Sequence, residues 1–127
     1  MNGTDKKYLV DSNIIIYHLN NEPLATSFLE NNIHLCTISQ ITYIEVLSFD
    51  FSIDEEKRVK ELLENFEILD INKKISEKAI QNRKVKKIKI PDNIIASTSQ
   101  VNNLKLVTRN TKDFTLLNIE MINPFEV

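Results

Sequence analysis

Residues 8–19 of the chain read YLVDSNIIIYHL, and this stretch decides the fold. Tyr8 to Val10 form a short apolar run that is typical of a buried β-strand, and the run ends at Asp11. The pair Ser12-Asn13 consists of residue types that begin helices, and the apolar segment Ile14 to Leu19 follows it. The stretch therefore predicts a strand, an acidic residue at its end, and then a helix.

The same order of strand and helix recurs along the chain. We expect further strands at Ile33–Thr37, Glu67–Ile71, Lys105–Thr108 and Ile119–Ile122. We expect further helices to begin at Pro23, Ser39, Asp54, Asn72 and Pro91-Asp92. The apolar spacing places Ile44 and Ile80 on the inward faces of the helices that begin at Ser39 and Asn72. Strands that alternate with helices predict an α/β fold with a parallel sheet covered on both faces.

Length and composition are those of an ordinary globular protein. The 127 residues fit one domain, which we expect to span residues 1–127 with an N-terminal tail at 1–6. No apolar run is as long as a membrane span, and the N-terminus lacks the pattern of a signal peptide. A single cysteine, Cys36, excludes an internal disulfide and suits a reducing compartment. We therefore expect a cytoplasmic protein with no membrane partner.

Glycine and histidine are scarce, which excludes several classes of site. Gly3 is the only glycine, so the glycine-rich loops that bind phosphates or dinucleotides are absent. His18 and His34 are the only histidines and leave little material for a zinc site or a Ser-His-Asp triad. The net charge of −2 gives no basic surface overall, so a site for nucleic acid would need bound cations to reverse its local sign.

Four acidic residues occupy positions where polar residues are uncommon: Asp11, Glu45, Asp92 and Asp113. Ligands of parallel sheets collect beyond the carboxyl ends of the strands, and all four acids can reach that edge. Carboxylates gathered there would repel one another and lose hydration, and the usual remedy is a divalent cation with oxygen ligands. The pattern therefore indicates a metal-dependent enzyme that acts on phosphodiesters.

Each acid taken alone also has a simpler explanation. Asp11 could form an Asx-turn or cap a helix, Asp92 could be a helix N-cap, and Asp113 could be a solvated loop residue. Glu45 is harder to explain in this way. It lies on or beside the apolar face of its helix, with no arginine or lysine one turn away, so the sequence favours a functional role for it.

Four segments carry a resemblance to a known family: LVDSNIII at 9–16, SQITYIEVL at 39–47, IPDNIIAS at 90–97 and LVTRNTKDF at 106–114. In order and spacing they resemble the PIN-domain nucleases, particularly the VapC-type toxins of prokaryotic toxin–antitoxin pairs. The resemblance implies a three-layer α/β/α sandwich with a central, mostly parallel five-stranded sheet. Asn93 departs from the family, which usually has a small apolar residue at this position, and could alter access to the metal.

The resemblance also implies a site and a function. It maps the family's acids onto Asp11, Glu45, Asp92 and Asp113, as catalytic residues and metal ligands, with Asn13, Thr108 and Asn110 as supporting polar residues. The implied protein is an endoribonuclease that depends on Mg²⁺ or Mn²⁺ and is the toxin component of a type II toxin–antitoxin system. Its implied partners are an RNA substrate, a cognate antitoxin and a second copy of the chain in a homodimer.

Two alternatives stay open. A non-catalytic PIN-like module would only bind RNA or protein. A Mg²⁺-dependent aspartyl phosphotransfer protein would also place an aspartate at a strand end, but phosphatases of that kind need a second aspartate two residues later. This chain has Asn13 at that position.

A basic run leads into Asp92, and its charged members are Arg83, Lys84, Lys86, Lys87 and Lys89. Such a run is most often a solvated helix end that the helix dipole favours. Contact with an RNA backbone is the alternative, because the run lies so close to an acid of the expected site. We expect His18 and His34 to be packing or surface residues and Cys36 to be an inert small hydrophobic residue.

Overall fold

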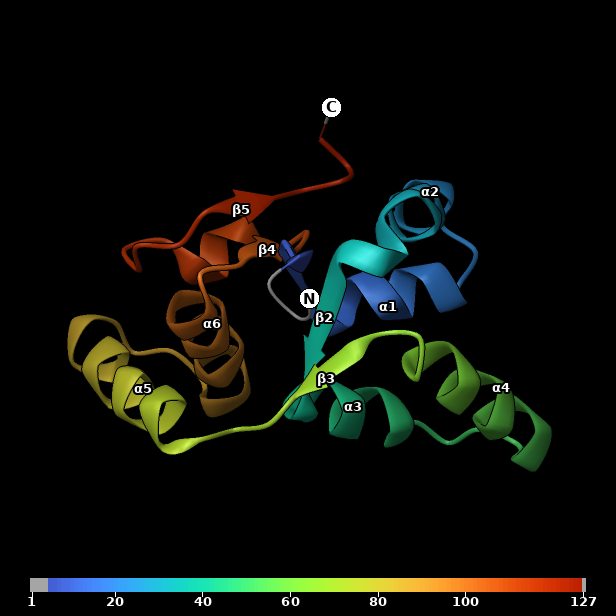
Figure 1. Ribbon diagram of the computed structural model, residues 1–127, viewed down its shortest axis with the longest axis horizontal. Coiled ribbons are helices and arrows are strands. Elements are labelled where there is room, and N and C mark those ends of the chain that lie inside the picture. The colour runs from blue at the N-terminus through green and yellow to red at the C-terminus, as the bar shows by residue number, and fades with distance from the viewer. Residues whose placement is uncertain (1–4, 127) are drawn as a thin grey trace.

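The structure is a computed structural model and describes residues 5–126. In this part of the chain, five strands form one parallel sheet in the order β3-β2-β1-β4-β5, with helices on both faces (Figure 1). The strands are β1 (Tyr8–Val10), β2 (Cys36–Ser39), β3 (Glu67–Leu69), β4 (Lys105–Val107) and β5 (Met121–Ile122). The predicted three-layer α/β/α sandwich is confirmed, and each of its strand pairings is parallel.

The helices follow the predicted alternation. Those of the described residues are α1 (Ser12–Leu19), α2 (Pro23–Asn32), α3 (Gln40–Leu47), α4 (Ile53–Leu63), α5 (Lys73–Val85) and α6 (Ile90–Asn102), together with the short 3-10 helices η2 (Ile33–Leu35) and η3 (Thr111–Phe114). No helix among residues 5–126 is both long and apolar enough to cross a membrane. The tail predicted at residues 1–6 lies mostly outside the described residues.

Alternating side chains of the two middle strands fill two separate cores. Val10 of β1 and Val107 of β4 pack on the face covered by α1 to α4. Leu9 and Leu106 point to the opposite face, which α6 and η3 cover. Successive side chains of a strand point to opposite faces, so a strand that is apolar throughout is buried on both. Figure 1 shows the two groups of helices on either side of the sheet, with α5 packed outside α6.

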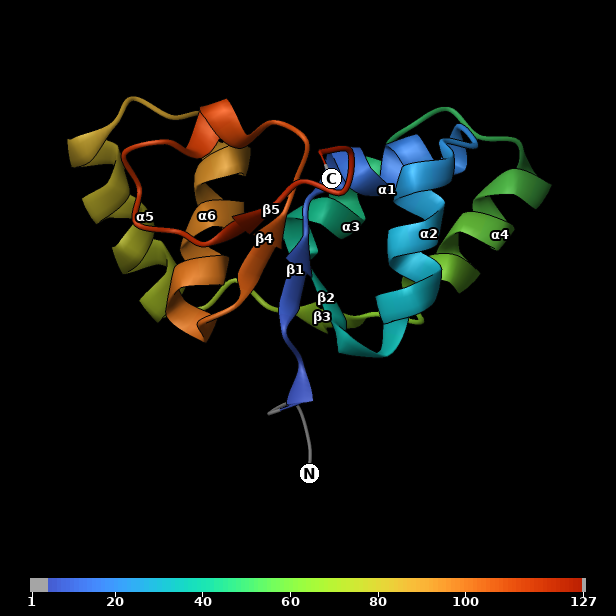
Figure 2. The ribbon, with the colours of Figure 1, turned by 90° about the horizontal axis from the view of Figure 1, so that it is seen from above.

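All the strands of the sheet end at the same edge because they are parallel. Figure 2 shows this edge at the top of the view, where the β1–α1 junction, η3 and the connection between α5 and α6 lie. The register pairs Val10 with Val107. Asp11 follows β1 and Thr108 follows β4, so these two residues leave the sheet side by side.

Some predicted boundaries are wrong. Ile33–Leu35 form the 3-10 helix η2, and the second strand begins only at Cys36. Ser52, not Asp54, is the N-cap of α4: its hydroxyl accepts a hydrogen bond from the Glu55 N–H, and its own N–H donates to the Glu55 carboxylate. This reciprocal pair satisfies two backbone donors, so the cap forms at Ser52. The third and fourth strands end earlier than predicted and the fifth begins later.

Two predicted core residues are exposed. Ile44 is 55% exposed because α3 turns Thr42 and Val46 toward the core instead. Ile80 is 58% exposed because the buried side chains of α5 are Ile75 and Asn82, which lie seven residues apart on one helix face. In both helices a polar residue shares the buried face, and apolar spacing alone did not reveal this.

A buried polar network joins α5 to α6. Asn82 donates from its side-chain amide to Asn93 Oδ1 at 3.2 Å, Ser97 Oγ at 3.1 Å and Gln100 Oε1 at 2.8 Å. Asn93 donates in turn to the carbonyl of Ala79 at 2.8 Å. Asn93 is 1% exposed and engages α5, so the concern that it alters access to the metal is not supported by its contacts.

Replacing Asn82 by alanine should destabilise the fold. The change removes the donor for three buried or partly buried acceptors, and an unsatisfied buried polar group costs about 1–3 kcal/mol. Urea unfolding should show this loss for Asn82→Ala, whereas Gln81→Ala, at an exposed position of the same helix, should change stability by less than about 0.5 kcal/mol. Equal stability of the two variants would show that the network does not hold the helices together.

Candidate active site

The four predicted acids line one open groove at the carboxyl edge of the sheet. The groove has a volume of about 520 Å³. Its lining residues come from α1, α3, α6 and the region of η3: Asp11, Ser12, Asn13, Ile16, Ile44, Glu45, Ser48, Phe49, Asp92, Asn110 and Asp113. Glu45 therefore faces the site rather than open solvent, and Asp92 lies on the same groove as Asp11.

Asp11 is the most deeply buried of the acids, with 6% of its surface exposed. Its Oδ2 accepts hydrogen bonds from the Thr108 hydroxyl at 2.7 Å and from the Asn13 side-chain amide at 3.2 Å. Asp11 occupies the N-cap position of α1 but makes no side-chain capping bond to the helix. Asp11 thus stands at the helix cap as the simpler explanation expected, but its carboxylate accepts hydrogen bonds from two other side chains.

Glu45 is held in the groove by a residue that the sequence reasoning did not assign to the site. The Ser12 hydroxyl donates to Glu45 Oε1 at 2.6 Å, and the Thr42 hydroxyl lies 3.0 Å from the same serine oxygen. Ser12 was interpreted only as a helix-starting residue. Its position directly after Asp11, at the beginning of a helix that must pack on the sheet, is the signal that could have identified it.

Asp92 and Asp113 complete the groove from the other side. Asp92 lies in the first turn of α6, whose N-cap is Lys89, so the N-cap explanation for Asp92 is wrong. Asp113 is an exposed residue of η3. The backbone N–H of Asn110 donates to the Thr108 hydroxyl oxygen at 3.1 Å, which fixes the connection between β4 and η3 next to Asp11.

The groove carries an excess of negative charge, which Lys89 offsets only in part at Asp92. Burial, aided by the charges of Asp92 and Glu45, raises the pKa of Asp11 to about 6, although the Thr108 hydroxyl opposes the shift. Burial, followed by repulsion from Asp113 and Glu45, also raises the pKa of Asp92. Between residues 5 and 126 the only ion pair joins Lys60 and Glu56 in α4, so no lysine or arginine pairs with these acids.

These observations fit a hard divalent cation. Buried carboxylates that lack a cationic partner are unfavourable unless a cation neutralises them, and carboxylate oxygens are the ligands that Mg²⁺ prefers. In the part of the chain that the structure describes, no three Asp, Glu, His or Cys side chains are grouped closely enough to enclose an ion. Mg²⁺ does not require such a group, because it usually binds one or two carboxylates directly and keeps several water ligands.

A basic hollow borders the acidic groove and shares Asp92 and Asp113 with it. The hollow has a volume of about 260 Å³, and its other lining residues are Lys86, Lys87, Ile88, Lys89 and Lys112. Lys86 Nζ also donates to the carbonyls of Lys112 and Thr115 at 3.3 and 3.0 Å. It therefore ties the α5–α6 connection to η3.

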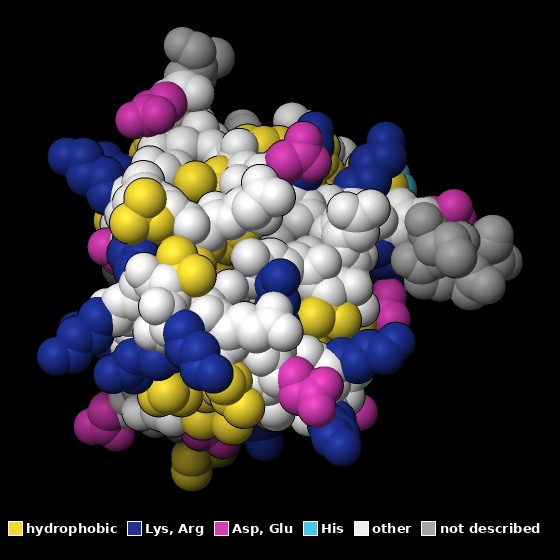
Figure 3. Space-filling model, turned by 90° about the vertical axis from the view of Figure 1, so that its left-hand side faces the viewer, with side chains coloured by type: hydrophobic (Ala, Val, Ile, Leu, Met, Phe, Trp, Pro, Cys, Tyr) yellow, Lys and Arg dark blue, Asp and Glu magenta, His cyan; other side chains and the backbone are white. Residues whose placement is uncertain are grey.

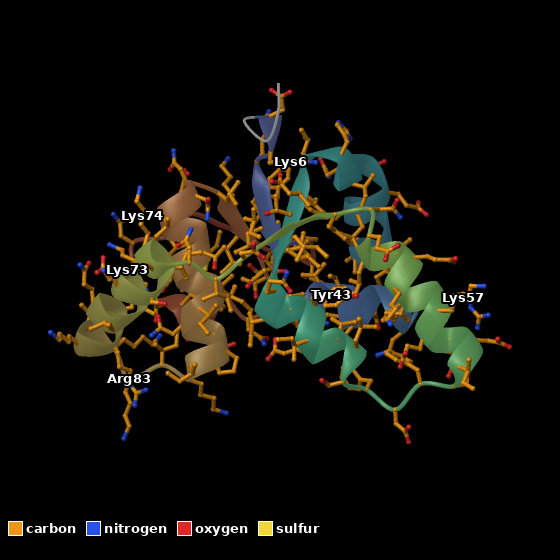
Figure 4. All side chains as sticks on the ribbon, turned by 60° about the horizontal axis from the view of Figure 1, so that its bottom comes forward. Lys6, Tyr43, Lys57, Lys73, Lys74 and Arg83 are labelled. Carbon is orange, nitrogen blue, oxygen red and sulfur yellow. The ribbon has the colours of Figure 1, made fainter. Side chains whose placement is uncertain are left out.

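The first residues of the basic run do not line this hollow. Figure 4 shows Arg83 at the end of α5, pointing away from the rest of the chain. Figure 3 shows lysine and arginine side chains spread around the face that includes α5, with exposed hydrophobic side chains between them. Arg83 and Lys84 thus match the solvated helix end, whereas Lys86, Lys87 and Lys89 lie next to the acids.

The histidines and the cysteine lie outside the groove. The His18 ring nitrogen Nδ1 is 2.7 Å from the Thr26 hydroxyl, and His34 is exposed. Cys36 is fully buried in the sheet, and burial raises the pKa of its thiol to about 12. All three agree with the packing or surface roles that the sequence predicted.

The chain belongs to the PIN-domain family, because the family's sequence model matches residues 8–118. This membership confirms the resemblance carried by the four sequence segments. No curated protein sequence matches significantly.

Solved structures agree with the family. A structure described as a toxin–antitoxin complex from Klebsiella pneumoniae contains a chain 35% identical to this one, with a TM-score of 0.85, and the match covers 95% of this chain and 100% of that one. FitAcB from Neisseria gonorrhoeae is 23% identical with a TM-score of 0.79, covering 94% and 99%. DNA-bound VapBC from Salmonella typhimurium is 22% identical with a TM-score of 0.80, covering 94% and 98%. At these lower identities the last two show the fold alone.

Replacing Asp11 by asparagine should stabilise the metal-free protein at neutral pH. Well below pH 3.8, the carboxyl is protonated in both the folded and the unfolded state and costs no stability. As the pH rises from there toward 6, the unfolded chain releases its proton first, so the free energy of unfolding falls. Above the folded-state pKa the loss is complete at about 3 kcal/mol.

Urea unfolding in EDTA should therefore show a gain in stability for Asp11→Asn near neutral pH and little gain in acid. Asp54→Asn, at an exposed position in the first turn of α4, is the matched control and should change stability by less than about 1 kcal/mol. A lower stability of Asp11→Asn at neutral pH would show that the Asp11 carboxylate is not under electrostatic strain.

Proposed function

We propose that this protein is an endoribonuclease dependent on Mg²⁺ or Mn²⁺ and is the toxin component of a type II toxin–antitoxin pair. The observation that carries the proposal is the convergence of Asp11, Glu45, Asp92 and Asp113 on one groove, where no lysine or arginine of residues 5–126 forms an ion pair with them. Membership of the PIN-domain family supports nuclease chemistry. The likeness to a chain of a toxin–antitoxin complex, at 35% identity over 95% of this chain, supports the toxin role.

The chain's own residues would hold and orient the reactants. Asp11, Glu45 and Asp92 would bind or orient one or two metal ions, directly or through water, and Asp113 would complete the pocket, because the groove brings all four to one side of the sheet. Thr108 and Asn13 fix the direction of the Asp11 carboxylate, and Ser12 fixes that of Glu45. When bound, the cation would lower the pKa of a coordinated water and neutralise charge on the phosphodiester oxygens.

Polar groups beside the acids would place the RNA. Asn110 lines the groove, where its side-chain amide would orient an attacking water or a phosphate oxygen. Lys86, Lys87, Lys89 and Lys112 line the neighbouring hollow, where they offset the repulsion between the acids and a polyanion. We assign Arg83 and Lys84 a weaker role, limited to attraction over a distance.

The proposed biological setting is cytoplasmic, with an antitoxin that blocks the acidic groove and a homodimer as the assembly. A basic side chain of the antitoxin among the four carboxylates would supply the missing positive charge. Light scattering of the purified protein at micromolar concentration tests the dimer, and a monomeric mass would remove that part of the proposal.

The geometry weakens the phosphotransfer alternative. Asn13, which stands where a phosphatase of that kind needs its second aspartate, donates its amide to Asp11 and so acts as support for the first. The other alternative, a non-catalytic binding module, can be distinguished by experiment, because such a protein would bind RNA without cleaving it in the presence of metal.

Asparagine at position 11 or 92 should abolish cleavage of RNA without unfolding the protein. Each change removes one ligand charge while nearly preserving the shape of the side chain, and we expect losses of more than about a hundredfold in the rate of RNA cleavage. Gel analysis of RNA incubated with Mg²⁺ measures the effect, with circular dichroism as the folding control. Asp54→Asn should cleave like the parent; full activity of both Asp11→Asn and Asp92→Asn would refute the site.

Mg²⁺ should raise the melting temperature of the parent protein. A ligand that binds only the folded state stabilises it by mass action, and neutralised carboxylates remove their mutual repulsion. Asp92→Asn should show a smaller rise, and Asp54→Asn should match the parent. A parent melting temperature that does not change in millimolar Mg²⁺ would contradict a preformed metal site.

A further inference from the structure

Arg109 lies between two residues of the site, Thr108 and Asn110, yet its side chain takes no part in the interactions described above. Its guanidinium carbon is 4.1 Å from the centre of the Phe125 ring and 5.0 Å from the centre of the Tyr17 ring. These two rings meet edge to face with their centres 5.1 Å apart. Three segments far apart in the sequence, the β4–η3 connection, the C-terminal end of the described chain and α1, therefore converge on one guanidinium group.

The backbone of Arg109 is fixed relative to the acidic groove. Its N–H donates to Asn13 Oδ1 at 3.5 Å, and its carbonyl accepts from Asn123 Nδ2 at 3.5 Å. The amide group of the same Asn13 donates to Asp11 Oδ2. One side chain thus links the Asp11 carboxylate to the backbone of Arg109. Asn13 and Ile16 of α1 line the groove, as does Asn110, so Arg109, whose backbone contacts Asn13 and which precedes Asn110, lies beside the α1 end of the groove.

The charge of Arg109 is not used within the described part of the chain. The residue is exposed, and no carboxylate of residues 5–126 lies within 4.0 Å of its guanidinium nitrogens. Contact with aromatic rings restrains a guanidinium group but leaves the N–H donors at its edge available. A restrained arginine with free donors matches the planar, two-oxygen edge of a phosphate group.

The position of Arg109 also matters for the electrostatics of RNA binding. Four carboxylates in the groove repel a polyanion even when one cation neutralises part of their charge. The lysine-lined hollow supplies positive charge on the side of α6 and η3. Arg109 supplies positive charge at the α1 end of the groove.

We propose that Arg109, held by Tyr17 and Phe125, is a binding site for a phosphate of the RNA strand at the α1 end of the groove. This inference rests on the proposed function and names a residue that places its substrate. The competing explanation is that Arg109 only fastens the C-terminal segment to α1. The two differ in whether loss of the side chain changes the salt dependence of RNA binding.

The test measures RNA binding in the Asp11→Asn background, with Mg²⁺ present, so that the probe is not cleaved. The probe is a short fluorescein-labelled single-stranded RNA of mixed sequence, and anisotropy titrations are repeated over a range of salt concentrations. Arg109→Ala should weaken binding by about three- to tenfold and reduce the slope of log affinity against log salt by about 0.7, the value for one phosphate contact on a single strand.

Two further variants separate the effect of the positive charge of Arg109 from the effect of the rings that hold its side chain. Arg109→Lys keeps the charge and should keep most of the salt slope, while it loses part of the affinity because the planar donor pair is gone. Phe125→Leu keeps the arginine but removes one ring, and should weaken binding by less than Arg109→Ala with the slope unchanged. Arg58→Ala, which removes an exposed arginine from α4, is the matched control and should leave both quantities as in the background protein.

The outcomes are distinct. If Arg109→Ala lowers the melting temperature but leaves affinity and salt slope like those of Arg58→Ala, Arg109 only fastens the C-terminal segment and this inference is wrong. If Arg109→Ala gives this result while the parent protein cleaves RNA with Mg²⁺, the proposed function stands without the inference about Arg109. If the parent neither binds nor cleaves RNA, the proposed function fails and takes this inference with it.

Discussion

The hydrogen bond from the Thr108 hydroxyl to Asp11 is the interaction on which the arrangement of the site depends. β1 and β4 pair in parallel with Val10 opposite Val107, so the next residue of each strand must emerge at the same place. One is an acid that cannot be solvated well there, and the other is a hydroxyl that donates to it at 2.7 Å. The sheet register thus sets both the burial of the carboxylate and its direction.

Around that pair, small polar side chains hold the acids at fixed positions. Ser12 restrains Glu45, and Asn13 restrains Asp11 while it also meets the backbone of Arg109. These residues are adjacent on the first turn of α1, and they face different partners because successive residues of a helix point about a quarter turn apart. The first turn of α1 therefore positions Glu45 of α3, the Asp11 carboxylate and the backbone of Arg109 after β4. A carboxylate held in this way keeps its negative charge near others at a cost in stability, which a cation can relieve.

Much of this arrangement could be predicted from the sequence. The alternation of apolar strands with helices was enough to predict a parallel sheet, and strand ends followed by acids were enough to predict a common edge. What escaped prediction was polar packing inside the helical layer. Ile44 and Ile80 lie on the exposed side because Thr42 and Asn82 are buried and hydrogen-bonded, and an apolar periodicity assigns polar residues to the surface. Ser12 escaped because its partner Glu45 is 33 residues away and no local rule connects them.

The central position of β1 has a consequence for when this protein becomes complete during its synthesis. β1 pairs on one side with β2 and on the other with β4, a strand that begins at Lys105. A nascent chain that has emerged only as far as α5 carries the first two acids but lacks Asp92, Asp113 and the hydroxyl that orients Asp11. Contacts between such distant segments form late in folding. A nascent chain therefore lacks the assembled groove until β4 and η3 have been synthesised and have joined the sheet.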